Sequence, residues 1–448
     1  MRWLVTLLFV SSLTAQPAPD FSAVEQSARE ELAKLNIPGA SIAIVRGDRV
    51  VFAKGVGIAD VETGEAVRPD MVFRLGSTTK MFTATALVGL AVEGKIDLNA
   101  PIGKYIPNLP PKLSQITANQ LLSHTAGIHD EAPMYGSHDE SALGNGIHAW
   151  TDDWLFASPG KIFSYSNPGY WLAGYLVETL SGMPYADAED VRIFRPLGMQ
   201  HSSFRPLMAM TWPLAQGHDA GPDGKPRVAR PAADNAASWP AGSLFSTTHD
   251  LARFVIAFLN DGRIDGKQVI DPKVIAALST PHVRYPDSEE SYGYGLTIHE
   301  FRGVHVIEHG GSRMGYGSHI RMLPAQRSAI IIQTNRSGAN LPATVDKATE
   351  MLASLQPKEE TRPKPPLAVT ESDLTRVAGT YRNGDQHIEI FARDGRLFLK
   401  RGGREVALVK HSESRYAPEN GPDIVVVAGR DGKAEYLFNG SRALARLQ

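Results

Sequence analysis

A serine and a lysine three residues apart carry the strongest chemical signal in this sequence. Ser77 follows Gly76, and apolar residues at helical spacing continue from Lys80 to a stop at Gly94. One helical turn separates the two side chains, so both lie on the same face near the helix start, where the dipole favours a developing anion. A serine hydroxyl needs a nearby base to become a nucleophile, and a desolvated lysine can be that base near neutral pH. The pair therefore predicts an activated serine.

The spacing alone is weak, because a helix-capping serine beside a solvated lysine would produce it too. Ser158 and Lys161 share the same spacing. There Pro159 and Gly160 break the helix that would align the two side chains, so we discount that pair.

A tyrosine and an asparagine two residues apart form the second candidate group. Tyr165 beside a cationic lysine could relay protons, and Asn167 could orient the lysine and hold a substrate amide. The alternative for Tyr165 is a loop aromatic packed on the core. The same pattern recurs at 381–383, where we interpret it as a coincidence at the start of a strand.

The third candidate group follows the apolar strand predicted over 304–307. His309, Gly310, Gly311 and Ser312 come next, and two glycines let a backbone edge lie against a substrate. The backbone amide of Ser312 could then complete an oxyanion hole with that of Ser77. Alternatively, His309 is a strand-end histidine with local hydrogen bonds.

In their order and wide spacing, the three groups resemble the serine β-lactamase and D,D-peptidase clan, specifically its class-C-like branch of esterases, D-aminopeptidases and penicillin-binding-type hydrolases. The stretches LLSHTAGI at 121–128 and PAGSLFSTTHDL at 240–251 resemble further signatures of that branch. Several ordered motifs are more specific than any one of them. The resemblance covers about residues 21–355.

The resemblance implies roles for the candidate residues. Ser77 would be the nucleophile, Lys80 its base and Tyr165 the proton relay to the leaving group. Asn167 would bind substrate, as would the 309–312 stretch, whose Ser312 amide would share the oxyanion hole with that of Ser77. The implied fold is an α/β (α+β) domain, an antiparallel sheet flanked by helices, with an all-helical lobe and the site between them.

Two departures from the clan bear on the substrate. Efficient β-lactamases of this branch have Lys-Thr-Gly where this chain has His309-Gly310-Gly311, and Ser243 follows Gly242 where two glycines are usual. Histidine is mostly neutral at pH 7, so it should hold a β-lactam carboxylate weakly. An esterase, amidase or D-amino-acid peptidase is therefore favoured over a dedicated β-lactamase.

The chain organisation predicts two domains. We expect a signal peptide at 1–16, the hydrolase domain at 20–355, a Pro-rich linker at 356–367 and a small all-β barrel or sandwich at 368–448. The last segment resembles the lipocalin-like domain of some relatives, which would shape the pocket or mediate oligomers, or be passive. Expected elements are a helix over 21–35 with a Ser22–Glu25 capping box, a loop over 131–149, a final helix over 341–355, and strands over 40–45, 50–56, 292–298, 304–307, 317–323 and 329–334.

Composition narrows the function classes. The net charge of −2 gives no support for a nucleic-acid partner, and no cysteine is available for disulfides or thiolate chemistry. No segment after the signal peptide is long and apolar enough to span a membrane. The His-Asp-Glu tripeptides at 129–131 and 138–140 fit a solvated loop better than a metal site, so no metal or other cofactor is predicted.

These observations predict an exported serine hydrolase, periplasmic or secreted, that cleaves ester or amide bonds of a small molecule or peptide, cell-wall-derived peptides and β-lactams included. The alternative is a non-catalytic penicillin-binding-like sensor of peptidoglycan or another ligand. A transpeptidase would differ only in its acceptor. The sequence leaves the natural substrate and the oligomeric state open.

Overall fold

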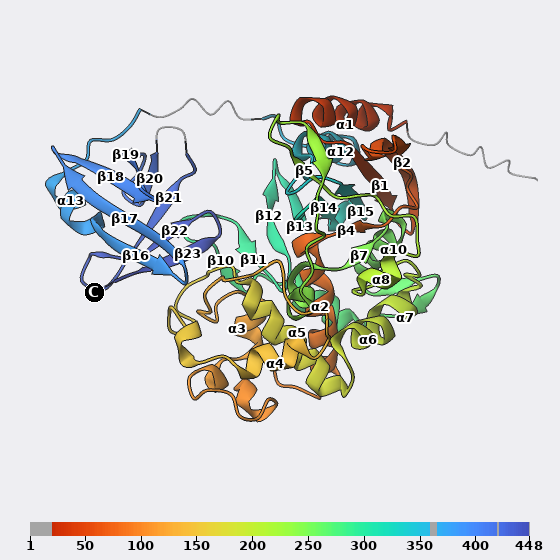
Figure 1. The fold of residues 1–448 in the computed structure, drawn as a ribbon, viewed down its shortest axis with the longest axis horizontal. Coiled ribbons are helices and arrows are strands. Elements are labelled where there is room, and N and C mark those ends of the chain that lie inside the picture. Colours follow the sequence, from red (N-terminus) through yellow and green to blue (C-terminus); the bar gives the residue numbers. More distant parts are fainter. Residues whose placement is uncertain (1–19, 359–364, 419–420, 448) are drawn as a thin grey trace, which may run out of the picture.

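The computed structural model describes residues 20–358, 365–418 and 421–447. These residues form a sheet with helices on both faces, a helical lobe below the sheet and a barrel to one side (Figure 1). The predicted signal peptide and residues 359–364 of the predicted linker lie outside the described residues, so the predicted domain boundaries stay predictions.

One antiparallel sheet of nine strands is built from both ends of residues 20–355, as predicted. Its first strand, GASIAIVR, is apolar and β-branched on both faces because helices cover both sides of it. In spatial order the strands are β10 (Val283–Arg284), β11 (Ser291–Tyr292), β12 (Thr297–Phe301), β13 (Val304–Arg313), β14 (Tyr316–Leu323), β15 (Ser328–Thr334), β1 (Gly39–Arg46), β2 (Arg49–Asp60) and β3 (Glu65–Ala66).

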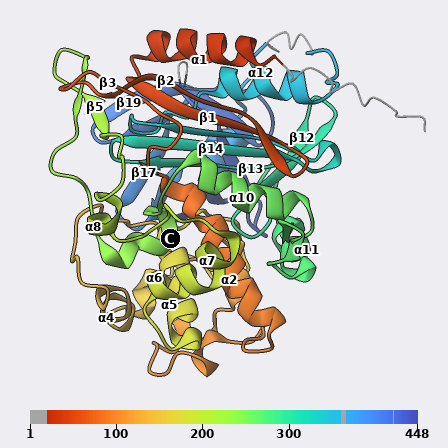
Figure 2. The same cartoon turned by 90° about the vertical axis from the view of Figure 1, so that its right-hand side faces the viewer.

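Two helices, α1 (Ser22–Leu35) and α12 (Pro342–Leu352), lie side by side on the outer face of the sheet (Figure 2). Apolar residues of both helices form one buried cluster with β1 and β15. The predicted capping box of α1 is wrong: the N–H of Ser22 donates to Asp20 Oδ1 at 2.8 Å, and no side chain caps the helix.

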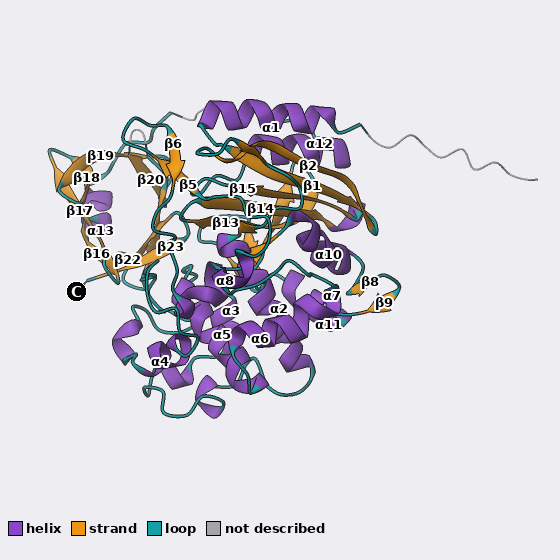
Figure 3. Cartoon of the chain, turned by 45° about the vertical axis from the view of Figure 1, so that its right-hand side comes forward, coloured by secondary structure: helices purple, strands orange, loops and turns teal. Residues whose placement is uncertain are grey.

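The inner face of the sheet packs on the helical lobe and on α10 (Thr248–Leu259) (Figure 3). The other helices on this side are α2 (Lys80–Val92), α3 (Ala118–Leu122), α4 (Ala142–His148), α5 (Asn167–Ser181), α6 (Tyr185–Glu189), α7 (Arg195–Leu197), α8 (Pro206–Ala209), α9 (Trp239–Gly242) and α11 (Pro272–Ser279). Short strand pairs join β4 (Phe73–Arg74) to β7 (Phe245–Ser246), β5 (His218–Ala220) to β6 (Pro226–Val228), and β8 (Arg263–Ile264) to β9 (Lys267–Gln268).

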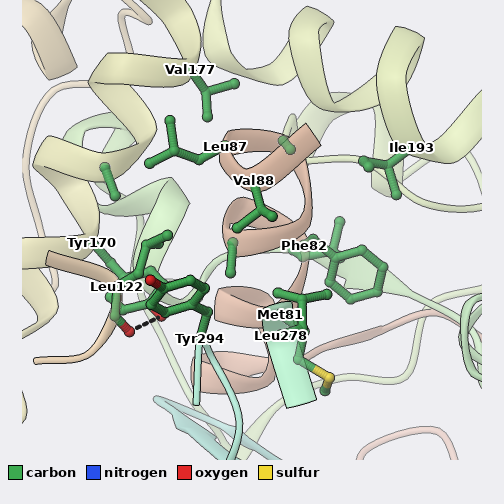
Figure 4. Packing of buried hydrophobic residues seen from close by; sticks show 14 of the residues in the cluster. Met81, Phe82, Leu87, Val88, Leu122, Tyr170, Val177, Ile193, Leu278 and Tyr294 are labelled. Carbon is green, nitrogen blue, oxygen red and sulfur yellow. Dashed lines mark hydrogen bonds between the residues drawn. The ribbon is translucent and has the colours of Figure 1, made fainter. Parts of the chain in front are cut away.

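Helix α2 is the centre of the lobe and is apolar nearly all round, as expected of a fully buried helix. Figure 4 shows Phe82, Leu87 and Val88 of α2 packed among side chains of neighbouring elements. The hydroxyl of Tyr170 on α5 donates to the carbonyl of Leu122 at 2.9 Å. The helix that carries Lys80 is therefore held on all sides.

Three predicted elements differ in the structure. The predicted strand over 292–298 is two short strands, β11 and β12, because Gly295 has φ +72° and turns the chain. The predicted loop over 131–149 contains α4. Strand β13 runs on to Arg313, so the His309–Ser312 stretch lies within the strand and not after it.

The C-terminal segment forms a closed barrel of eight antiparallel strands, which resolves the predicted choice of barrel or sandwich. The strands are β16 (Gly379–Asn383), β17 (Gln386–Arg393), β18 (Arg396–Arg401), β19 (Arg404–Lys410), β20 (Arg415–Pro418), β21 (Ile424–Ala428), β22 (Ala434–Asn439) and β23 (Arg442–Arg446), preceded by α13 (Glu371–Val377). On the outside of the barrel, Val425, Tyr436 and Phe438 are buried against Phe163 and Tyr292, which precede the linker. The barrel thus packs beside the loop that carries Tyr165.

Among the described residues, none of the helices has the length and apolar character needed to cross a membrane.

Candidate active site

Ser77 lies in a short 3-10 turn, Gly76–Thr79, that leads directly into α2. Gly76 has φ +64°, and a Cβ there would lie 2.5 Å from the backbone nitrogen of Ser312. Only glycine allows both this conformation and this close approach. The turn therefore sits directly against β13, with Ser77 and Ser312 on adjoining backbones.

The amine of Lys80 is fully buried and has three polar neighbours. Its Nζ lies 3.3 Å from Ser77 Oγ, 2.7 Å from Asn167 Oδ1 and 2.7 Å from the carbonyl oxygen of Ala241. Two of the sequence-predicted residues, Ser77 and Asn167, thus meet at the third, Lys80.

Asn167 is held in one orientation by a carboxylate. Ser166 caps α5, its Oγ accepting from the N–H of Gly169, and so places Asn167 in the first turn. Oδ1 of Asp130 accepts from the backbone N–H of Asn167 at 2.7 Å and from its Nδ2 at 3.1 Å. Because Asp130 takes the amide nitrogen, the amide oxygen faces Lys80.

Tyr165 lies over the same lysine, as predicted. Lys80 Nζ is 4.8 Å from the centre of its ring, and the ring of His124 is 4.2 Å from it on centroids. The Tyr165 hydroxyl is buried and donates no hydrogen bond within the described part of the chain. Buried hydroxyls nearly always have a hydrogen-bond partner, so we expect a bound group to supply the partner of this one.

Burial and charge set the protonation of these groups. Burial lowers the pKa of Lys80 well below its usual value; Asp130 opposes this effect, and Arg442 and Arg313 add to it. Burial raises the pKa of Tyr165, and the Ser77 hydroxyl offsets part of the rise. The lysine is thereby biased toward the neutral amine, and the tyrosine keeps its proton.

In the 309–312 stretch, His309 and Gly311 are buried, whereas Ser312 is exposed. Burial lowers the pKa of His309 to about 3, and both ring nitrogens are engaged, Nδ1 with the Gly310 carbonyl at 2.6 Å and Nε2 with the Tyr292 hydroxyl at 3.1 Å. His309 is therefore neutral and has no free nitrogen for a carboxylate. Gly311 lies against Leu75, where a Cβ would be 2.0 Å from the carbonyl oxygen.

A cavity of about 430 Å³ opens beside the serine. Ser77, Asn167 and Ser312 line it, together with Trp171, Ser238 and Arg313. Tyr165 and His309 are not among its lining residues. The cavity therefore offers room for a substrate group next to Ser77, on surfaces that differ from those around Tyr165.

Two charged residues of the site escaped the sequence analysis. Asp130 belongs to a tripeptide interpreted as a solvated loop, but its side chain is buried against Asn167, so that interpretation is wrong for Asp130. Its Oδ2 accepts from Nε of Arg442, 312 residues later in the barrel, at 2.5 Å. Asp130 could have been suspected as a carboxylate near the LLSHTAGI stretch, whereas no local signal marks Arg442.

Asn383 also lies near the site, although nothing in the structure makes the 381–383 pattern a second catalytic group. It is buried between barrel and lobe, where Oδ1 accepts from the N–H of Asp130 at 3.3 Å and Nδ2 donates to the carbonyl of Ala443 at 2.6 Å. The N–H of Tyr165 donates to the carbonyl of Ser441 at 2.9 Å. Barrel residues thus hold two loops of the site.

Within the ranges that the structure describes, no group of three or more histidine, aspartate or glutamate side chains is arranged to bind a metal ion. His138, from the second tripeptide, instead pairs with Asp234 at 2.8 Å.

Comparison with known proteins places this geometry in a family. A sequence model of the family described as Beta-lactamase matches residues 24–355. The chain belongs to the beta-lactamase family. This match agrees with the clan that the sequence resemblance implied.

Individual known proteins are similar to this chain over most of its length. Penicillin-binding protein 4 of Amycolatopsis lactamdurans is 28% identical over 362 residues, which are 77% of this chain and 93% of that protein. The crystal structure of SurE is 25% identical with a TM-score of 0.74, covering 95% of this chain and 99% of that one. The D-amino acid amidase of Ochrobactrum anthropi SV3 is 25% identical with a TM-score of 0.60, covering 74% and 96%.

Proposed function

We propose that this protein is an exported serine hydrolase that cleaves ester or amide bonds through an acyl-enzyme on Ser77. The surroundings of Lys80 are the observation that carries the proposal. A neutral amine has two N–H groups and one lone pair. Asn167 Oδ1 and the Ala241 carbonyl, both at 2.7 Å, take the two N–H groups, which leaves the lone pair for the hydroxyl of Ser77 at 3.3 Å.

Acylation follows from this arrangement. Lys80 accepts the hydroxyl proton while Ser77 Oγ attacks the substrate carbonyl, and the amides of Ser77 and Ser312 stabilise the oxyanion. Tyr165, protonated because burial raises its pKa, gives its proton to the leaving group and regains one from Lys80. Water then attacks the acyl-enzyme, with the same groups as base and acid.

The proposed substrates are esters and amides, including peptides with D-amino acids. The D-amino acid amidase similarity supports an amide of this kind. A dedicated β-lactamase activity is disfavoured, because His309 is neutral and both its nitrogens are engaged. Export to a periplasm or the medium rests on the sequence of residues 1–16 alone.

Intact-mass spectrometry after exposure to a fluorophosphonate, and separately to a penicillin, tests the proposal. We expect a single fluorophosphonate adduct on Ser77 that Ser77→Ala abolishes, with hydrolysis of a 4-nitrophenyl ester falling at least about 1,000-fold. No adduct on folded wild-type protein would contradict the proposal and favour the second candidate, a non-catalytic ligand sensor. A lasting penicillin adduct would indicate a penicillin-binding or peptidase-like enzyme.

A further inference from the structure

Arg313 is a charged residue of the cavity without a charged partner. It is the last residue of β13 and lies on the same face as His309 and Gly311, toward the lobe. Its guanidinium contacts Ser238 Oγ at 3.4 Å from each Nη, longer than an ordinary hydrogen bond, and its buried Nε has no partner. In the part of the chain that the structure describes, no carboxylate lies within 4.0 Å of it.

The neighbouring charges do not compensate Arg313. Asp234, the closest negative influence, pairs with Arg74 at 2.9 Å and with His138 at 2.8 Å, and it accepts from Trp239 at 3.2 Å. Asp219 also lines the cavity, but its Oδ1 accepts from the Ser337 hydroxyl. Neither carboxylate forms an ion pair with Arg313, so within the described residues its guanidinium has no anionic partner.

The surroundings of Arg313 disfavour its positive charge, as its lowered pKa indicates. Burial and the charge of Arg74 lower the pKa of Arg313 to about 9, so the guanidinium is still charged at neutral pH. Arg313 is half-buried and has no ion pair, so a ligand anion that pairs with it would be bound favourably. A carboxylate suits a guanidinium best, since both are planar and can make two parallel hydrogen bonds.

The position of the cavity assigns that carboxylate to one part of the substrate. In the proposed function, Tyr165 protonates the leaving group, and Tyr165 does not line the cavity. Ser77 and Ser312, which hold the acyl carbon and its oxyanion, do line it. The cavity is thus the place for the acyl side of the scissile bond.

We propose that Arg313 is an anion-binding residue of the acyl pocket and that the preferred substrates carry a carboxylate in the acyl group that is transferred to Ser77. This inference rests on the proposed function and names the substrate class of the same site.

Matched ester pairs test the preference. The 4-nitrophenyl monoesters of succinic, glutaric and adipic acid carry the carboxylate at increasing distance, and their methyl esters are neutral but otherwise alike. We expect wild-type kcat/KM to be higher for the free acid at the chain length that reaches Arg313. In Arg313→Gln the ratio of acid to methyl ester should fall about 10- to 100-fold, the range for a hydrogen bond to a charged group. Arg313→Lys should retain part of the preference.

Arg29→Gln is the matched control, because it removes one positive charge from an exposed position on α1, over the opposite face of the sheet. Its ratio should equal that of the wild type. A ratio unchanged in Arg313→Gln, or a wild type that prefers the methyl ester at every length, would overturn the proposal.

A binding measurement separates this inference from the proposed function. Calorimetric titration of Ser77→Ala with monomethyl glutarate, and with the corresponding ester of the preferred chain length, requires no catalysis. We expect binding of the monomethyl acid, loss of binding in the Ser77→Ala, Arg313→Gln double variant, and none of the dimethyl ester in either protein. Binding of the monomethyl acid, with no fluorophosphonate labelling of Ser77 in the wild type, would contradict the proposed hydrolase but support the anion site. Labelling of Ser77, with neither binding of the acid nor a preference for the acid ester, would support the hydrolase and contradict the anion site.

Discussion

At the scale of single residues, the protonation of Lys80 sets the reactivity of Ser77 in the proposed mechanism. The base must be the neutral amine, so we expect kcat/KM for a neutral 4-nitrophenyl ester to rise with pH through the pKa of Lys80. Because burial lowers that pKa, the rise should be complete at a lower pH than an exposed lysine would give. Lys80→Ala should reduce kcat/KM about 10²- to 10⁴-fold.

The exposed Lys104 supplies the control for that substitution. Lys104→Ala should keep both the rate and the pH profile of the wild type. A Lys80→Ala variant with the wild-type acid limb would show that another group is the base.

A second residue-scale prediction concerns stability in acid. Burial lowers the pKa of His309 to about 3, while an unfolded histidine titrates near 6.5. Between these values the unfolded chain binds the proton and the folded chain does not, so stability falls as pH falls through this window. His309 alone should cost about 2 kcal/mol between pH 7 and pH 5. Denaturant unfolding at both pH values measures the loss, and His309→Gln should show a loss smaller by that amount; an equal loss would mean that His309 titrates normally.

At the scale of elements, the contact of β13 with the turn before α2 fixes the distance between Ser312 and Ser77. A Cβ on Gly311 would lie 2.0 Å from the Leu75 carbonyl oxygen and 2.3 Å from Ser318 Oγ. Gly311→Ala should therefore push the strand and the turn apart, lower stability by about 1–3 kcal/mol and slow fluorophosphonate labelling.

The adjacent glycine is a matched comparison for this prediction. A Cβ on Gly310 would meet its nearest atom, Asn340 Nδ2, at 3.5 Å, an ordinary contact. Thermal unfolding of Gly310→Ala should lie within a few degrees of the wild type, well above that of Gly311→Ala. Equal melting temperatures for the two variants would mean that the close packing of β13 on the turn is not required.

Local sequence patterns predicted a helix or strand well where the residues of that segment alone determine its structure. The helix predicted over 21–35 is α1, and the apolar run after Lys80 forms α2. Failures occurred where a single residue or a distant contact decides. Gly295 divides one predicted strand into two, and Ser22 is the first residue of α1, after the N-cap residue Phe21, so its side chain does not cap the helix.

The candidate site shows the same division. Ser77 and Lys80 are three residues apart, and their spacing on a helix start already places them together. Asp130 and Arg442 are paired across 312 residues, and neither lies in a motif that requires the other. A sequence without an alignment holds no signal for such a pair, so only the fold could show it.

At the scale of the whole molecule, the barrel takes part in the site. Arg442 pairs with Asp130, Asp130 orients Asn167, and Asn167 accepts from Lys80. Arg442 also lies 5.4 Å from the centre of the Tyr165 ring. The sequence left open whether this domain is passive; the contacts show that a barrel side chain reaches the residues around the lysine.

This connection predicts an effect on the pH profile. The cation of Arg442 lowers the pKa of Lys80 and also neutralises Asp130, whose charge raises that pKa. Arg442→Gln removes both influences, so the Lys80 pKa should rise and the acid limb of kcat/KM should move to higher pH. At pH 7, kcat/KM should fall roughly 3- to 30-fold, as for other couplings through a network. Arg442→Lys should move the limb less, because the charge remains.

The exposed Arg396 on β18 provides the control within the same domain. Arg396→Gln should leave the profile unchanged, with a melting temperature that shows how far the loss of one barrel arginine affects folding. A barrel that only supports the fold would give an Arg442→Gln protein with a lower melting temperature and the wild-type acid limb. A displaced limb at an unchanged melting temperature would instead establish that the barrel tunes the base of the hydrolase through the Arg442–Asp130 pair.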